Sequence, residues 1–114
     1  MLKDEDVVRL RHMHDAARRA TKFAQGRSRA DLDTDDMFAL ALARLLEILG
    51  EAAKNVSPEC RQGYPQIPWK SVAGTRDRLI HGYFDMDLDI IWEIVTVDLP
   101  PLSAALETII SSLE

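Results

Sequence analysis

The chain has 114 residues, the size of one domain, and 46% of them are hydrophobic, which is enough to form a buried core. Its formal net charge of −5 argues against a protein that coats nucleic acid through charge alone. The single cysteine, Cys60, excludes an internal disulfide and argues against a zinc site.

The cellular compartment can be predicted from the first residues and the apolar runs. The first six residues are largely charged and lack the apolar core of a secretory signal. The longest apolar stretch, residues 37–49, is interrupted by Arg44 and Glu47 and is too short to span a bilayer. Together with the lone cysteine, these features predict a soluble cytoplasmic protein without a membrane partner.

Charge is distributed unevenly along the chain. Residues 9–29 carry seven basic side chains against the single acid Asp15, whereas residues 85–114 carry seven acids and no lysine or arginine. Such stretches are commonly solvated helix faces. The functional alternative is a basic first helix that helps to hold RNA and an acidic last helix that faces a protein partner.

Residues 3 to about 25 have the periodicity of an amphipathic helix. The apolar face is mostly alanine, which permits a close approach of another helix. It consists of Leu10, Met13, Ala17, Ala20 and Ala24. His12 and His14 are two positions apart, so they do not share a face and do not indicate a metal site.

A polar break over residues 26–33 precedes the second helix. Thr34 is its predicted N-cap, with Asp35 and Asp36 in a first turn that favours acids. Eleven of the thirteen residues from 37 to 49 are apolar, which is typical of a helix buried on more than one side. This helix, predicted to end near residue 55, is therefore central in a bundle or shared between the core and a dimer interface.

Two shorter helical segments follow, and each is opened by a proline. Ser57 is the predicted cap of a helical turn over residues 58–62. The next helix opens at Ile67-Pro68-Trp69 and is predicted to run to about His81. It contains Gly74, where the missing side chain would let another backbone or a substrate come close.

Asp87 is the predicted cap of the last helix. An apolar stripe with alternating spacings of four and three crosses Pro100 and Pro101 without losing phase, so a helix kinked at the prolines is predicted. The stripe consists of Leu88, Trp92, Val95, Leu99, Leu102, Leu106, Ile109 and Leu113.

No strand pattern or internal repeat is present in the sequence. The predicted fold is therefore all-α, an up-and-down bundle of four main helices with one short extra helical turn, and residues 1–114 form a single helical domain.

Residues 76–83 carry the chemistry of the chain. Arg76 offers a charged planar fork that suits phosphate oxygens, and His81 can exchange a proton near neutral pH. Tyr83 adds a hydroxyl that can donate, accept or be modified. The pattern Arg-x-x-x-x-His-x-Tyr therefore suits phosphate-ester chemistry without a metal.

A plainer interpretation is that a helix ends here. A histidine in the last turn favours the helix dipole, and Gly82 is a common residue just beyond a helix end. In an ideal helix, Arg76 and His81 would point roughly 140° apart. A shared site thus requires that the helix distort or end between them.

The motif residues Arg76, His81 and Tyr83 make the chain resemble the HepT-like branch of the HEPN ribonucleases. The resemblance covers about residues 35–106. Its other matching segments are Gly50-Glu51-Ala52-Ala53-Lys54, Ile67-Pro68-Trp69 and Asp98-Leu99-Pro100-Pro101-Leu102. Asp77 departs from the pattern, because asparagine is more often expected there, and it adds an acid beside the site.

The resemblance implies a metal-independent endoribonuclease that needs no cofactor and acts as the toxin of a type VII-like toxin–antitoxin module. An RNA 2′-hydroxyl would attack the adjacent phosphate. His81 would move protons, and Arg76 would bind the phosphate and stabilise the charge that grows in the transition state. Tyr83 would orient the substrate, and Arg78 is a further candidate for phosphate contact.

Two protein partners are expected as well. The resemblance implies a minimal nucleotidyltransferase antitoxin that transfers AMP from ATP to Tyr83. One chain offers a single motif histidine, whereas cleavage uses both a base and an acid, so a two-fold homodimer with both copies of the motif in one cleft is expected.

A second hypothesis is a catalytically silent, HEPN-like helical dimer that binds a nucleotide or a nucleotidyltransferase partner. A DNA-binding helix-turn-helix protein is a third, and the acidic balance and the long helices argue against it.

Overall fold

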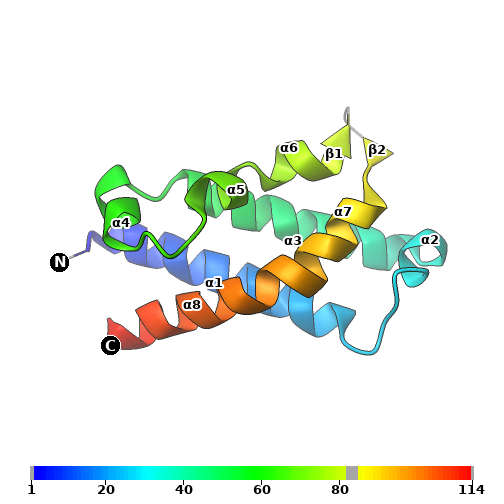
Figure 1. Ribbon diagram of the computed structural model, residues 1–114, viewed down its shortest axis with the longest axis horizontal. Helices are drawn as coiled ribbons and strands as arrows, with labels where there is room; N and C mark the ends of the chain where they lie inside the picture. The colour runs from blue at the N-terminus through cyan, green and yellow to red at the C-terminus, as the bar shows by residue number, and fades with distance from the viewer. Residues whose placement is uncertain (1, 82–84, 114) are drawn as a thin grey trace.

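Four helical segments run alternately up and down in the computed structural model, which describes residues 2–81 and 85–113 (Figure 1). The all-α, up-and-down bundle predicted from the sequence is confirmed. The long helices are α1 (Asp4–Ala24), α3 (Asp36–Lys54) and the last segment, which comprises α7 (Leu88–Glu93), the π-helical turn η1 (Ile94–Asp98) and α8 (Leu99–Ser112). The third helical segment comprises α5 (Trp69–Ala73) and α6 (Thr75–Leu79). The connections contain α2 (Asp31–Thr34), α4 (Pro58–Gly63), β1 (Ile80–His81) and β2 (Asp85–Met86).

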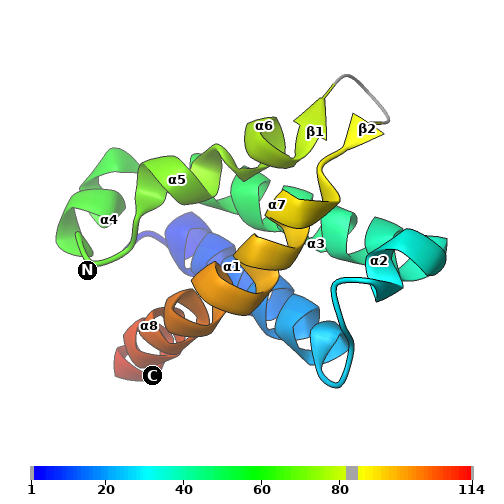
Figure 2. The same cartoon turned by 45° about the vertical axis from the view of Figure 1, so that its right-hand side comes forward.

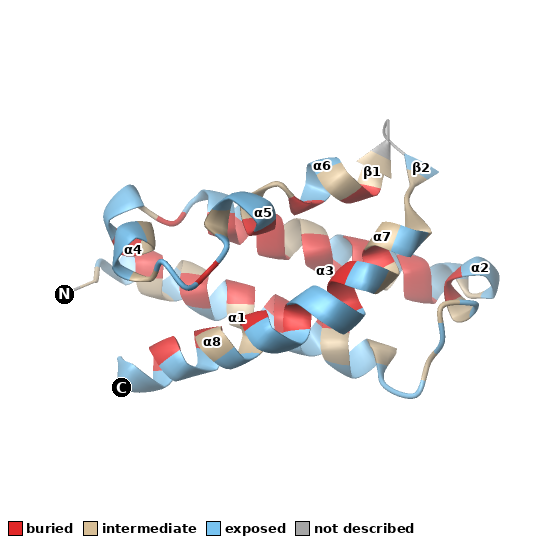
Figure 3. Cartoon of the chain, viewed as in Figure 1, coloured by how far each residue is buried: buried red, intermediate tan, exposed pale blue. Residues whose placement is uncertain are grey.

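Helix α3 lies at the centre of the bundle. It packs against α1 on one side and against α5 and α6 on another (Figure 2). The alanine-rich face of α1 is fully buried at Ala17 and Ala20, as the sequence predicts for a close helix pair. Buried residues lie on the inward faces of α1, α3 and α8, whereas exposed residues lie on their outward faces (Figure 3).

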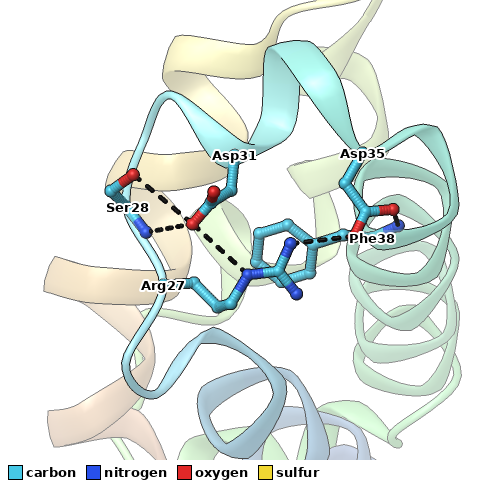
Figure 4. A network of polar contacts seen from close by, with 5 residues as sticks. All are labelled: Arg27, Ser28, Asp31, Asp35 and Phe38. Carbon is cyan, nitrogen blue, oxygen red and sulfur yellow. Dashed lines mark hydrogen bonds and ion pairs between the residues drawn. The ribbon is translucent and has the colours of Figure 1, made fainter.

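The N-terminus of α3 is built differently from the prediction. Thr34 is not the cap, because residues 31–34 form the short helix α2. Asp35 caps α3 instead, and its side chain accepts a hydrogen bond of 3.1 Å from the backbone of Phe38. Arg27 binds to the first turn of α3 (Figure 4). Its Nη2 donates a hydrogen bond of 2.9 Å to Asp35, and its guanidinium carbon lies 4.0 Å from the Phe38 ring centre. The hydrogen bond from Arg27 is the main reason that the pKa of Asp35 is lowered.

The predicted turn after α3 is confirmed, and it is tied to the first helix. Ser57 caps α4 by accepting from the backbone of Cys60. Asp6 of α1, only 3% exposed, accepts hydrogen bonds from the Ser57 amide at 2.8 Å and from the Ser57 hydroxyl at 2.6 Å. Burial would raise the pKa of Asp6, but the two hydrogen bonds from Ser57 and the positive charges of Lys3 and Arg9 together lower it.

Replacing Asp6 with alanine should lower the free energy of unfolding at pH 7 by about 1–3 kcal/mol, because it leaves the Ser57 amide without its partner. A carboxyl whose pKa is lowered by folding stabilises the protein above its unfolded pKa of about 3.9, and this contribution is lost as the pH falls through the folded pKa. Urea unfolding should therefore show a gap between wild type and Asp6→Ala that narrows in acid. Asp4→Ala, which removes an exposed acid from the same helix, is the control, and an equal loss in that variant would contradict the prediction.

The prediction of one continuous helix over residues 67–81 is wrong, because the helix is interrupted and ends before His81. Gly74 separates α5 from α6, and α6 ends at Leu79. Ile80 is extended, with φ −117° and ψ 120°, and β1 pairs with β2 in an antiparallel ladder that sets His81 opposite Asp85. These strands could not be predicted from the sequence, because two residues per strand are too few for an alternating pattern.

The last segment is continuous from α7 to α8, and its irregular turn lies before the prolines. Asp87 caps α7 as predicted, accepting from the backbone of Ile90 at 3.1 Å. The irregular turn is the π-helical turn η1, which lies before the prolines at which a kink was predicted. Pro100 and Pro101 follow it in the first turn of α8, where proline is tolerated.

In the described part of the chain, the run Leu88–Ser112 alone is long and apolar enough to cross a membrane by length and composition. Core helices share this property, and this one packs closely against α1.

Candidate functional site

Helix α6 carries two of the predicted site residues, Arg76 and Arg78, and directs them to different sides. The side chain of Arg76 is 62% exposed, and its Nε lies 3.7 Å from Oε2 of Glu47 on α3. Glu47 also lies 3.8 Å from Nη1 of Arg44. The contact between Arg76 and Glu47 is long, the arginine is mostly exposed, and Glu47 is shared with Arg44. Glu47 therefore holds Arg76 weakly and leaves its guanidinium accessible to a phosphate.

Arg76 opens onto a polar hollow of about 250 Å³ between α3 and the α5–α6 segment. The residues that line it are Glu47, Gly50, Glu51, Lys54, Ala73, Arg76 and Asp77. Arg76 and Lys54 can attract an anion, and the acids, including the unexpected Asp77, limit how much negative charge the hollow accepts.

Gly50, which lines this hollow, is the point of a close contact between α3 and α5. A Cβ atom built on Gly50 of α3 would lie 3.2 Å from the carbonyl oxygen of Val72 on α5. Only glycine lets the two backbones approach this closely without a shift. The contact fixes α5 on α3, and the short α6 that follows places Arg76 beside Glu47.

Arg78 faces a different cleft, of about 440 Å³, which lies between α5–α6 and η1–α8. Its Nη1 is 3.4 Å from the hydroxyl of Ser71 and 3.7 Å from Oδ2 of Asp98. The two arginines predicted to contact phosphate therefore do not share one cavity within a single chain.

The predicted general acid or base, His81, follows the end of α6 by two residues. Since Ile80 is extended, the separation of about 140° for an ideal helix does not apply to Arg76 and His81. The His81 side chain and the whole of Tyr83 lie outside the described residues.

Glu47 is a residue near the site that sequence reasoning missed. In the sequence it is only one of two charges that interrupt an apolar helix. The available signal was the interruption itself, because a charge in a nearly all-apolar helix needs a partner or a solvent-facing position. Here it is 28% exposed and meets the motif arginine.

The two charged stretches are partly neutralised within the chain, which favours the plainer interpretation of them. Asp15 pairs with both Arg18 and Arg19 on α1. Arg29 donates to Asp89 of α7 at 2.7 Å. Among the described residues, no group of histidine, cysteine and acidic side chains is arranged to hold a metal ion.

Comparison with known proteins decides the family. Residues 13–109 match the family described as Ribonuclease HepT-like. The chain belongs to this family. The resemblance inferred from the motif is thus confirmed, as is the enzyme class at the level of a ribonuclease family.

Several relatives of this HepT-like chain carry names of the same kind. A protein of Caldanaerobacter subterraneus subsp. tengcongensis, named "Putative RNase", is 41% identical over 75% of this chain and 77% of its own length. A "Probable ribonuclease HepT" of Thermococcus cleftensis is 40% identical over 68% of this chain and 70% of its own. In Methanocaldococcus jannaschii, a "Gamma-glutamylcyclotransferase and putative RNase" is 35% identical over the whole chain, which spans 51% of that protein. No solved structure matches the chain.

Proposed function

We propose that this HepT-like chain is a metal-independent endoribonuclease and the toxin of a type VII-like toxin–antitoxin pair. The observation that carries the proposal is the intact sequence motif of Arg76, His81 and Tyr83 in a member of a ribonuclease family. The exposed guanidinium of Arg76 beside a polar hollow supports it.

The proposed reaction is transfer within the RNA chain. The 2′-oxygen of one nucleotide bonds to the adjacent phosphorus, the bond to the 5′-oxygen of the next nucleotide breaks, and a 2′,3′-cyclic phosphate results. One His81 accepts the 2′-hydroxyl proton, and a second protonates the leaving oxygen. Arg76 binds the phosphate and stabilises the charge of the pentacoordinate transition state.

The deciding assay incubates the purified full chain with an RNA and with a DNA of the same sequence, each with and without EDTA. RNA should be cut in both conditions and DNA in neither, because DNA lacks the attacking hydroxyl. Uncut RNA would favour the catalytically silent dimer, and loss of cleavage in EDTA would indicate a metal-dependent reaction.

A homodimer is proposed because of an uncovered apolar face on α3. Met37 and Leu40 are 83% and 52% exposed, although both are large and apolar. Helical spacing places them on the same side of α3 as Arg44 and Glu47, and Glu47 reaches Arg76. A second copy packed on this face would bury the apolar side chains and bring two motif regions together.

Tyr83 is proposed as the site at which a minimal nucleotidyltransferase antitoxin silences the enzyme. Its hydroxyl oxygen would attack the α-phosphorus of ATP, form a phosphodiester with AMP and release pyrophosphate. The added negative charge and base would compete with RNA for Arg76 and fill the entrance to the site.

Coexpression with such a nucleotidyltransferase should add the mass of AMP to the wild-type chain and should add none to Tyr83→Phe. Intact-mass spectrometry measures this directly. Tyr64→Phe is the matched control, because it removes the other tyrosine hydroxyl of the chain, and it should still be modified. An unchanged adduct on Tyr83→Phe would place the modification elsewhere, and inhibition without any adduct would contradict the proposed mechanism.

A further inference from the structure

A groove on the outer side of α5 and α6 is not used by the proposed chemistry. Its volume is about 690 Å³, within the range of about 300–1,000 Å³ that is common for ligand sites. It is lined by Pro68, Trp69, Lys70, Ser71, Gly74, Asp77 and Arg78. It continues the motif segment, because Asp77 follows the motif arginine directly and Arg78 precedes His81 by three positions.

The aromatic wall of this groove is held in a fixed position. Trp69 is half-buried and packs against the core, and its indole Nε1 donates a hydrogen bond of 3.0 Å to the carbonyl oxygen of Tyr64. The ring therefore cannot turn away without losing that bond. A fixed aromatic side chain at the edge of an open groove suits a stacking partner with a flat π-face.

The charges of the groove favour an anionic ligand, although the chain as a whole is acidic. Lys70 is exposed and makes no ion pair among the described residues. Arg78 lines both this groove and the cleft of about 440 Å³, and its guanidinium lies 3.4 Å from the Ser71 hydroxyl and 3.7 Å from Asp98. Asp77 is the single acid in the lining. Gly74 leaves the groove floor free of a side chain, and a Cβ there would lie 3.2 Å from the Lys70 carbonyl oxygen.

We infer that this groove, on the basis of the proposed ribonuclease function, binds a single-stranded RNA nucleotide that neighbours the bond to be cut. Its base stacks on Trp69, and its phosphate contacts Lys70 and Arg78. Sites for single strands combine an aromatic platform with cations in this way, whereas the bases of a duplex are already stacked. The enzyme should therefore prefer unpaired RNA.

Fluorescence can test the stacking, because the chain has two tryptophans, and Trp92 lies on α7 outside the groove lining. The ligand is a 2′-O-methylated oligouridylate, which cannot be cut because its attacking hydroxyl is blocked. In the variant Trp92→Phe, which retains Trp69, this RNA should quench the emission. In Trp69→Phe, which retains Trp92, it should not. Circular dichroism checks that both variants remain folded.

The phosphate contact is tested with Lys70→Ala. Its Kd for the same RNA should rise several-fold, and the slope of log Kd against log salt should fall by about one. Lys3→Ala, which removes an exposed lysine outside the groove, should bind like wild type. If wild type cuts RNA, yet Trp69 emission does not change and Lys70→Ala binds as tightly, the groove assignment is wrong and the ribonuclease function stands. If wild type neither binds nor cuts RNA, the ribonuclease function fails and the groove assignment with it.

Discussion

Replacing His81 with alanine should lower the rate of RNA cleavage by about 10²–10⁴-fold, because the proton transfers that it performs are worth that much. Arg76→Ala should lower kcat by a comparable factor of about 10²–10³, the usual effect of removing a group that stabilises transition-state charge. Both changes should also abolish toxicity in the cell. The measurements are single-turnover cleavage of a labelled RNA and growth after induced expression.

Arg18→Ala is the matched control for Arg76→Ala, because both arginines are exposed and each pairs with an acid. Arg18 lies on α1, outside the motif and outside the proposed dimer face on α3, so its loss should leave kcat within a few-fold of wild type. Circular dichroism should show unchanged helical content in all three variants, since the Arg76 side chain is 62% exposed and His81 follows the end of the helix. Full cleavage by folded His81→Ala protein would overturn the assignment.

Placing a charge on the exposed face of α3 should separate the proposed dimer and remove its activity. Leu40→Glu introduces a carboxylate where the second copy would pack, so light scattering at micromolar concentration should change from dimer to monomer. Cleavage should fall by about 10²-fold or more, because each monomer retains a single motif histidine.

Val97→Glu is the control for this change. Val97 of η1 is an apolar side chain of similar exposure, 61% against 52% for Leu40, and it lies on another element. That variant should remain dimeric. A wild-type chain that is monomeric and active would contradict the composite site, and so would a monomeric Leu40→Glu protein with full activity.

The sequence predicted those parts of the fold in which one local interaction dominates. Ser57 and Asp87 are caps in the structure because each is followed by a helix whose first amides need an acceptor. Thr34 met the same criterion, but the prediction that it caps α3 was wrong. Asp35 takes that role because Arg27, eight residues earlier in the chain, holds its side chain in place. Contacts of that kind leave no local pattern.

The candidate site, too, could be predicted from the sequence only in part. The motif spacing identified Arg76 and His81, but it could not show that α6 would end at Leu79 or that Gly50 would bring α3 so close to α5. The motif identified Arg76, with Arg78 as a further candidate for phosphate contact, but it did not show that the two side chains face different cavities. Only the packing of α6 shows that one opens onto a polar hollow and the other faces Asp98.

The hydrogen bond of 2.7 Å from the Asp87 amide to the Leu79 carbonyl oxygen joins the end of α6 to the cap of α7. Together with the pairing of β1 with β2, this bond ties α6 to α7 where the connection begins and ends. Adding residues to a connection whose two ends are held together costs little, since each doubling of its length costs only about 0.6 kcal/mol. Insertions just before Asp85 should therefore leave the bundle folded, which makes this position suitable for grafting a peptide tag or a fluorescent reporter next to the motif.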